Sequence, residues 1–225
     1  METRKAFDYE QGQFITHPFA KLSNDLSETL TDLVSLLKQE ALQNALLESW
    51  MPLRREDDDT RDDYTWHVTL LRGHRAIHKH QIRPLISTIR DACSTLEPFT
   101  LCLDNIDVFC NFERTKQFIV ITERTGIEQP ACSALRSALR GAIDKFAIKL
   151  TDEDETDDTR AHCSLLMRDI APGSPNIGED ERLAISKLVE EVSTTSLDQL
   201  PIYVIRVEKI FMKIGNHVYD FKLGD

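Results

Sequence analysis

Residues 66–71 (WHVTLL) and residues 161–166 (AHCSLL) share one pattern within this 225-residue chain, and that pattern decides the fold. Both stretches are rich in apolar residues, as short strands are. In each, a histidine is followed two positions later by a threonine or a serine. Residues i and i+2 of a strand face the same side. Each stretch therefore predicts a strand with an imidazole and a hydroxyl on one face and an apolar row on the other.

These four polar side chains suit the cleavage of a phosphodiester. The ordinary pKa of histidine is near 6.5, so one imidazole can accept a proton while the other donates one at neutral pH. Each such role is worth roughly 10²- to 10⁴-fold in rate. We predict that His67 and His162 are the catalytic pair, in either order of acid and base. Thr69 and Ser164 would then bind the phosphate, because hydroxyl groups can donate to its non-bridging oxygens.

A single histidine beside apolar residues is more often part of a core than a catalyst, so the argument depends on the pair. Among seven histidines, only His67 and His162 have Ser or Thr two positions later. His74, His78 and His80 lie on or before a predicted helix, where exposure to solvent is favoured over a metal site. We predict no bound metal and no cofactor.

Other residues near the two motifs have simpler interpretations. Arg72, Arg160 and Arg168 could each reach a phosphate or pair with neighbouring acidic residues. Trp66 precedes His67 and points to the opposite face, so core packing is favoured over base stacking. Cys163 also lies on the apolar face, which disfavours a nucleophilic role.

Composition bears on the compartment and on how a nucleic acid could bind. The five cysteines are odd in number and widely spaced, which argues against disulfides and a zinc cage and favours a reducing compartment. The sequence contains no apolar run that would predict a membrane span or a secretory signal. The net charge of −11 comes from two acidic runs at 56–63 and 152–158, predicted to be solvated loops. The rest of the chain is neutral, which does not predict broad, salt-driven binding along a nucleic acid and is compatible with binding of one chain end.

Hydrophobic periodicity predicts an α+β fold with antiparallel sheets. A helix from residue 24 would be capped by Ser23 or Asn24, and another would begin near Pro84. The predicted helices cover residues 24–48, 84–96, 131–147 and 179–197. The predicted strands cover residues 13–19, 64–71, 99–109, 117–123, 160–167, 201–213 and 217–223.

The two motifs resemble the signature of the 2H phosphoesterase superfamily. From about Gln13 to Leu223 the chain is similar to one of its families, the U6 small nuclear RNA phosphodiesterases. Three accessory segments carry that likeness: residues 14–17 (FITH) resemble a W-x-T-H strand, residues 108–118 (VFCNFERTKQF) resemble N-x-x-[KR]-T-[KR]-x-F, and residues 213–219 (KIGNHVY) resemble a K-x-G-N hairpin. The resemblance implies one domain over residues 1–225, with two lobes related by a pseudo-twofold axis around a central groove.

It also implies an activity: nuclear, metal-independent 3′ to 5′ trimming of the oligouridine end of U6 RNA, leaving a 2′,3′-cyclic phosphate. Whether that end is opened further to a monophosphate stays open. The partner would be an RNA 3′ end, with no membrane and a monomeric protein. One departure is the absence of an aromatic residue at 152–160, where the family often has one that stacks on the terminal base. The alternatives are another 2H enzyme that opens 2′,3′-cyclic phosphates, and a non-catalytic RNA-processing scaffold.

Overall fold

The structure is a computed structural model that describes residues 12–15, 18–41, 43–52, 66–71, 75–110, 115–123, 129–149, 160–171, 177–197 and 203–224. Both acidic runs, the turn at 111–114, the Thr16–His17 pair, Arg72 and His74 lie outside these ranges. No helix in the described part of the chain is long and apolar enough to cross a membrane.

Most described strands form one antiparallel sheet of 11 strands, in the order β7-β8-β10-β4-β2-β12-β1-β5-β9, with β13 paired to β12 and β3 paired to β10. β6 and β11 form a separate pair. The strands are β1 Gly12–Ile15, β2 Phe19–Lys21, β3 Met51–Pro52, β4 His67–Thr69, β5 Arg75–His78, β6 Phe99–Leu103, β7 Asn105–Cys110, β8 Lys116–Thr122, β9 Ile148–Lys149, β10 His162–Asp169, β11 Tyr203–Val207, β12 Lys209–Ile214 and β13 His217–Lys222. The two motif strands, β4 and β10, are therefore neighbours in the middle of the sheet.

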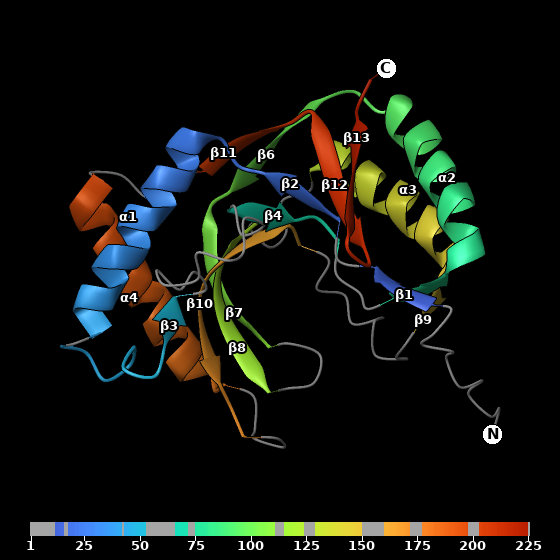
Figure 1. Cartoon of the computed structure of the whole chain (residues 1–225). Helices are drawn as coiled ribbons and strands as arrows, with labels where there is room; N and C mark the ends of the chain where they lie inside the picture. The colour runs from blue at the N-terminus through green and yellow to red at the C-terminus, as the bar shows by residue number, and fades with distance from the viewer. Residues whose placement is uncertain are drawn as a thin grey trace.

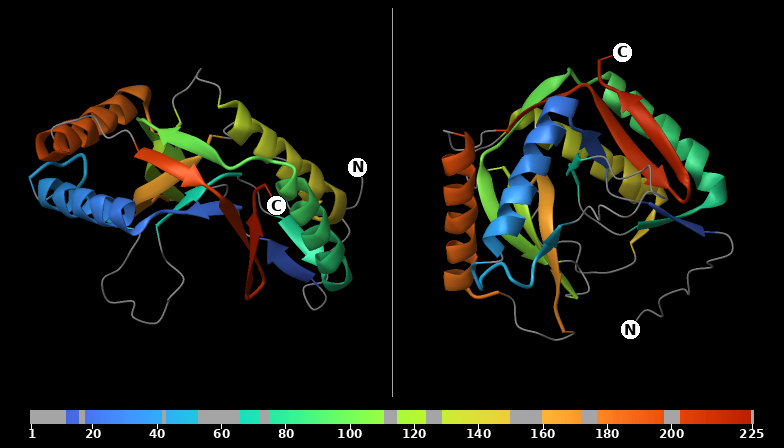
Figure 2. Two further views of the ribbon diagram at one scale, coloured as in Figure 1. Left: turned by 90° about the horizontal axis from the view of Figure 1, so that it is seen from above. Right: turned by 60° about the vertical axis from the view of Figure 1, so that its left-hand side comes forward.

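Four helices pack as two pairs on opposite flanks of the molecule (Figures 1 and 2). They are α1 Asn24–Ala41, α2 Ile82–Ser94, α3 Pro130–Phe146 and α4 Glu179–Leu197. α1 pairs with α4 beside β7, β8 and β10, while α2 pairs with α3 beside β12 and β13. This arrangement gives two halves that meet at the motif strands.

The helices cover the face of the sheet that does not carry the histidines. Ser186 of α4 donates a hydrogen bond of 3.1 Å to the carbonyl oxygen of Ile106 in β7. A small apolar cavity under α1 is lined by Leu26 and Leu30 together with Cys163 of β10. Since Cys163 alternates with His162 and Ser164, the two polar side chains face the other side of the sheet.

The predicted α+β class with antiparallel sheets is correct, and the predicted helices at 131–147 and 179–197 correspond closely to α3 and α4. The first helix was predicted to reach residue 48, but it ends at Ala41. There Asn44 closes a turn, because its backbone N–H donates to Glu40 and its side chain accepts from Leu46 at 3.0 Å. At the other end Ser23 is the cap, accepting a long hydrogen bond of 3.4 Å from Leu26.

The remaining corrections concern strands. The segments predicted at 13–19, 99–109 and 201–213 each contribute to two strands, and β5 at Arg75–His78 was missed. Long-range pairing explains these errors: β6 leaves the main sheet to pair with β11, and β5 exists because β1 and β9 flank it. The predicted hairpin at Gly215 is present, where φ is +57° and a Cβ would approach Gln13 Oε1 to 2.8 Å.

Candidate active site

The two histidine motifs lie side by side on β4 and β10. Thr69 is the direct partner of His162 in this antiparallel pair. The same register places Ser164 opposite His67. Directly opposed residues of an antiparallel pair share a face, with Cβ atoms about 4.5–5.5 Å apart. All four polar side chains therefore project to one side, in two crossed imidazole–hydroxyl pairs.

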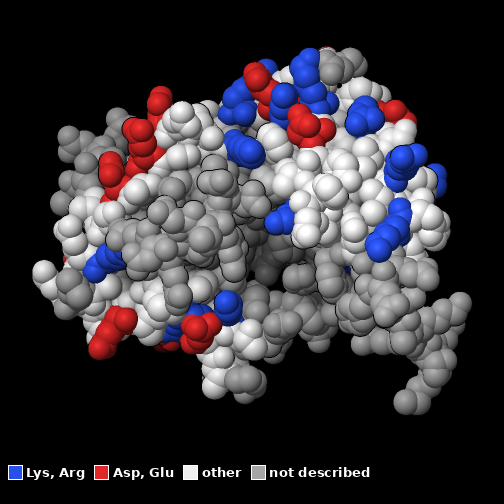
Figure 3. Space-filling model, in the orientation of Figure 1, with Lys and Arg blue, Asp and Glu red and all other residues white. Residues whose placement is uncertain are grey.

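This crossed arrangement sets the spacing of the site. The two imidazoles occupy one diagonal and the two hydroxyls the other, and diagonal neighbours on adjacent strands are about 7–8 Å apart. His67 and Ser164 are partly accessible to solvent, whereas Thr69 is 8% exposed and His162 is 7% exposed. One phosphate group fits within such a square, with an imidazole on either side. Figure 3 shows the molecular surface hollowed between the two halves.

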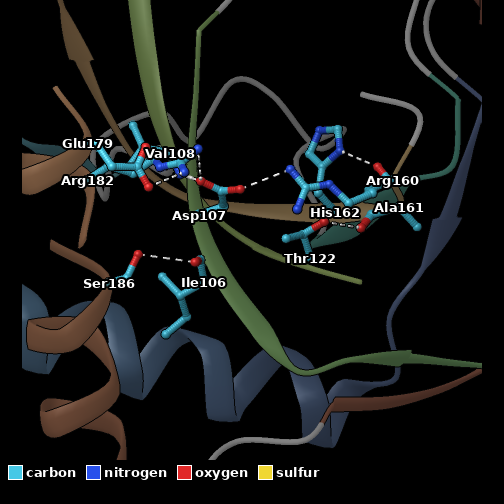
Figure 4. Close-up of polar contacts among 10 residues, drawn as sticks. All are labelled: Ile106, Asp107, Val108, Thr122, Arg160, Ala161, His162, Glu179, Arg182 and Ser186. Carbon is cyan, nitrogen blue, oxygen red and sulfur yellow. Dashed lines mark hydrogen bonds and ion pairs between the residues drawn. The ribbon is translucent and has the colours of Figure 1, made fainter. Parts of the chain in front are cut away.

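His162 is held in a defined orientation by the residue two positions before it. Its Nδ1 lies 3.1 Å from the carbonyl oxygen of Arg160. A carbonyl oxygen can only accept, so Nδ1–H is the donor and the neutral ring carries its lone pair on Nε2. Figure 4 shows this contact together with the ion pair that fixes Arg160, whose guanidinium lies 2.9 Å from Asp107 Oδ2. Proton transfer by the neutral ring would therefore use Nε2.

Each histidine also packs against one phenylalanine ring. Phe109 of β7 meets His162 edge to face, with ring centroids 5.1 Å apart. The Arg160 guanidinium lies over the same Phe109 ring at 5.3 Å. Phe19 of β2 meets His67 at a centroid distance of 5.0 Å. Rings packed in this way restrict the rotation of both imidazoles.

A buried ion pair connects both motif strands to α3. Arg136 of α3 pairs with Glu123, and its Nε donates a hydrogen bond of 3.0 Å to the carbonyl oxygen of Leu70. Glu123, only 4% exposed, also accepts a hydrogen bond of 2.6 Å from the backbone N–H of Ala161. Leu70 directly follows Thr69, and Ala161 directly precedes His162. The Arg136–Glu123 pair therefore holds the backbone next to Thr69 and the backbone next to His162.

Replacing Arg136 with methionine should destabilise the protein by about 3–5 kcal/mol, because Glu123 would remain as an uncompensated buried charge. Urea unfolding measures this loss. Arg140→Met, at an exposed position one turn further along α3, is the matched control and should change stability by less than about 0.5 kcal/mol. Adding Glu123→Gln to Arg136→Met should recover part of the loss. Equal, small effects of Arg136→Met and Arg140→Met would show that the ion pair does not anchor the strands.

The other residues singled out in the sequence interact with neighbouring parts of the protein. Arg168 bonds to Gln117 at 2.7 Å and to Glu181 at 2.9 Å. Trp66 packs against the core, as predicted, and its indole N–H donates to Thr31 at 3.0 Å. Burial raises the pKa of the Cys163 thiol to about 12, so it is not a nucleophile at neutral pH.

All five cysteines are free thiols. Within the described residues, no three His, Cys, Asp or Glu side chains form a group that could hold a metal ion. Sequence reasoning missed Asp107, Phe109, Glu123 and Arg136, because their roles arise from partners far along the chain. The alternation of Asp107 and Phe109 on one strand face was the available signal.

Comparisons with known proteins give one family and one fold. Residues 2–222 match the model of the HVSL family, described as an uncharacterised conserved protein. No curated protein matches the sequence. Usb1 of Kluyveromyces marxianus, solved with uridine monophosphate, is similar over 94% of this chain and 97% of that one, with 16% identity and a TM-score of 0.58. A second structure of the same Usb1 has a TM-score of 0.54 at 16% identity, over 94% of this chain and 97% of that one. LigT of E. coli, complexed with 3′-AMP, has 13% identity and a TM-score of 0.45, over 94% of this chain and 95% of that one.

Proposed function

The chain belongs to the HVSL family, whose fold is that of the 2H phosphoesterases, and on that premise we propose that it is a metal-independent 3′ to 5′ exoribonuclease. Its substrate would be the oligouridine 3′ end of U6 small nuclear RNA, in the nucleus. The observation that carries this proposal is the crossed pairing of His67, Thr69, His162 and Ser164 on one face of β4 and β10. The uridine monophosphate bound by the Usb1 of K. marxianus supports a preference for uridine.

In the proposed reaction the two imidazoles transfer protons, whereas the two hydroxyl groups stabilise charge on the phosphate. One histidine removes the proton from the 2′-hydroxyl of the penultimate nucleotide, and that oxygen forms a bond to the adjacent phosphorus. The bond from phosphorus to the 5′-oxygen of the terminal nucleoside breaks, and the other histidine protonates that oxygen. The attacking and leaving oxygens lie in line through phosphorus, so the base and the acid must stand on opposite sides of it. The histidine diagonal satisfies this requirement.

The hydroxyl diagonal stabilises the charge that builds up during the reaction. Thr69 and Ser164 flank the same phosphate and can donate to its two non-bridging oxygens. The products are a free nucleoside and an RNA chain that is one residue shorter, ending in a 2′,3′-cyclic phosphate. Opening of this end by water, with the two histidines exchanging their roles, would leave a monophosphate.

Mass spectrometry of the products from a short oligouridine, with excess chelator present, tests the proposal. We expect cleavage to continue in chelator, because proton transfer by two histidines needs no ion. We expect uridine to be released, and the shortened chain to carry a cyclic phosphate or the monophosphate derived from it. Release of uridine 5′-monophosphate from a chain ending in a 3′-hydroxyl would contradict the mechanism. Opening of a 2′,3′-cyclic phosphate without any shortening would favour the alternative 2H activity.

A further inference from the structure

A row of lysines leads from the candidate active site to the edge of the sheet. Lys21 of β2 is the direct partner of His67. The antiparallel register of β2 and β12 places Lys209 opposite Lys21, and Lys209 is the direct partner of Lys222 in β13. Directly opposed residues share a face. Lys21, Lys209 and Lys222, here called the lysine row, therefore continue the line of His67 on the face that carries the histidines.

Two aromatic side chains lie beside the lysine row on the same face. Phe19 and Phe211 stack with ring centroids 5.7 Å apart. The Lys21 ammonium lies over the Phe211 ring, 4.6 Å from its centroid. Both rings are half-buried, and Phe19 also touches His67. Cations interleaved with aromatic rings are the composition that single-stranded nucleic acid binds.

The charge of this surface differs from that of the rest of the protein. All three residues of the lysine row are exposed, and Lys213 lies on the same face. Among the described residues of β12 and β13 that share this face, Asp220 is the one carboxylate, 3.6 Å from Lys209. Figure 3 shows Lys and Arg gathered over the part of the surface near β12, β13 and the C-terminus, whereas Asp and Glu gather on the flank near α1. The protein therefore has a local basic surface although its net charge is −11.

On the other side of the histidine pair, the described arginines near β7 share one carboxylate. Arg160 is 2.9 Å from Asp107, and Arg182 is 3.6 Å from the same carboxylate. These cations are engaged within the protein. A phosphate chain leaving the site toward β8 and β7 would meet this ion-paired cluster, whereas one leaving toward β2 would meet the lysine row.

We propose that the lysine row binds the phosphates of the RNA strand upstream of the cleaved nucleotide. This inference rests on the proposed function and assigns a path to its substrate. An enzyme that removes the last nucleotide leaves the whole remaining chain on one side of the scissile phosphate. From Lys21 on β2 to Lys222 on β13 there are two strand spacings of about 4.8 Å, so the row spans about 10 Å, which is room for more than one phosphate.

The proposal predicts a salt-dependent and length-dependent affinity. Each phosphate contact on a single strand contributes about 0.7 to the slope of log affinity against log salt. Loss of three contacts should lower that slope by about 2 and weaken binding by roughly 10- to 100-fold at 0.1 M salt. The loss should be larger for a ten-nucleotide oligouridine than for a dinucleotide, because a dinucleotide has no upstream phosphates to place on the row.

Fluorescence anisotropy with a labelled ten-nucleotide oligouridine measures this, using a His162→Ala background in which the RNA persists. The test variant carries Lys21→Gln, Lys209→Gln and Lys222→Gln. The matched control removes the same charge from helices α1, α3 and α4, as Lys38→Gln, Lys145→Gln and Lys187→Gln. A variant with arginine at the three positions of the row keeps the charge and should bind like the parent. Melting curves confirm that each variant is folded.

Weaker binding and a smaller slope of log affinity against log salt, for the test variant alone, would support the proposed path of the RNA along the lysine row. Equal losses in the test and control variants, or a loss that does not depend on salt, would overturn it. The cleavage assay with the unmodified protein distinguishes a failure of the RNA path from a failure of the proposed function. A protein that cleaves oligouridine but whose lysine row is dispensable for binding would refute only the path, whereas a protein that cleaves no RNA would refute the proposed function.

Discussion

Alanine at either His67 or His162 should lower the rate of oligouridine cleavage by about 10²- to 10⁴-fold, because each imidazole performs a separate proton transfer. The double variant should be little slower than the worse single variant, since groups that act as a unit are not additive. The measurement is the single-turnover rate on a labelled oligouridine. It reports the chemical step without product release.

Two controls make this result specific. His80→Ala removes a histidine that is exposed and lies outside the site, stacked on His78 at 5.7 Å, and should leave the rate unchanged. Thr69→Ala and Ser164→Ala should cost less than the histidine variants, because each removes one hydrogen-bond donor and no proton shuttle. Circular dichroism and thermal melting establish that each variant is folded. A folded His67→Ala or His162→Ala protein within a few-fold of the parent rate would remove that residue from the mechanism.

An oligouridine with a single 2′-deoxy sugar at the penultimate position should bind normally and resist removal of its last nucleotide. The 2′-hydroxyl that it lacks is the attacking group, held next to the scissile phosphate by the RNA itself. Such intramolecular attack avoids the entropic cost of capturing a water molecule, a contribution that can reach about 7–11 kcal/mol in well-oriented systems. The loss of cleavage should therefore approach the detection limit. Gel analysis of the labelled RNA measures it.

The matched substrate carries the deoxy sugar at the terminal position. That sugar departs with the leaving group and takes no part in the attack, so cleavage should proceed at the rate of the all-ribose RNA. Equal cleavage of the two deoxy substrates would mean that water attacks phosphorus directly. The cyclic phosphate would then have to be abandoned as an intermediate, although the histidine pair could still act as base and acid.

Local patterns were sufficient for α3, for α4 and for the polar face of each motif strand. α3 and α4 agree with the sequence because apolar residues recur at helical spacing over many turns, a signal that needs no information from the rest of the chain. That the two polar positions of each motif share one face follows from strand alternation alone. Short strands such as β5 and the division of residues 99–109 at Asp104 were not predictable, because only their pairing partners stabilise them.

The sequence by itself determined which side chains carry the chemistry: two imidazoles, each with a hydroxyl two positions later, set on apolar strands. Only the tertiary structure decided that β4 and β10 are neighbours with Thr69 opposite His162, which converts two separate motifs into one crossed site. It also decided the contacts that hold the site, from the Arg160 carbonyl on His162 to the Glu123–Arg136 ion pair. The physical reason is the distance along the chain between the residues that set each feature. Alternation within a strand is fixed by covalent geometry, whereas the register between strands separated by about ninety residues is fixed by packing of the whole sheet.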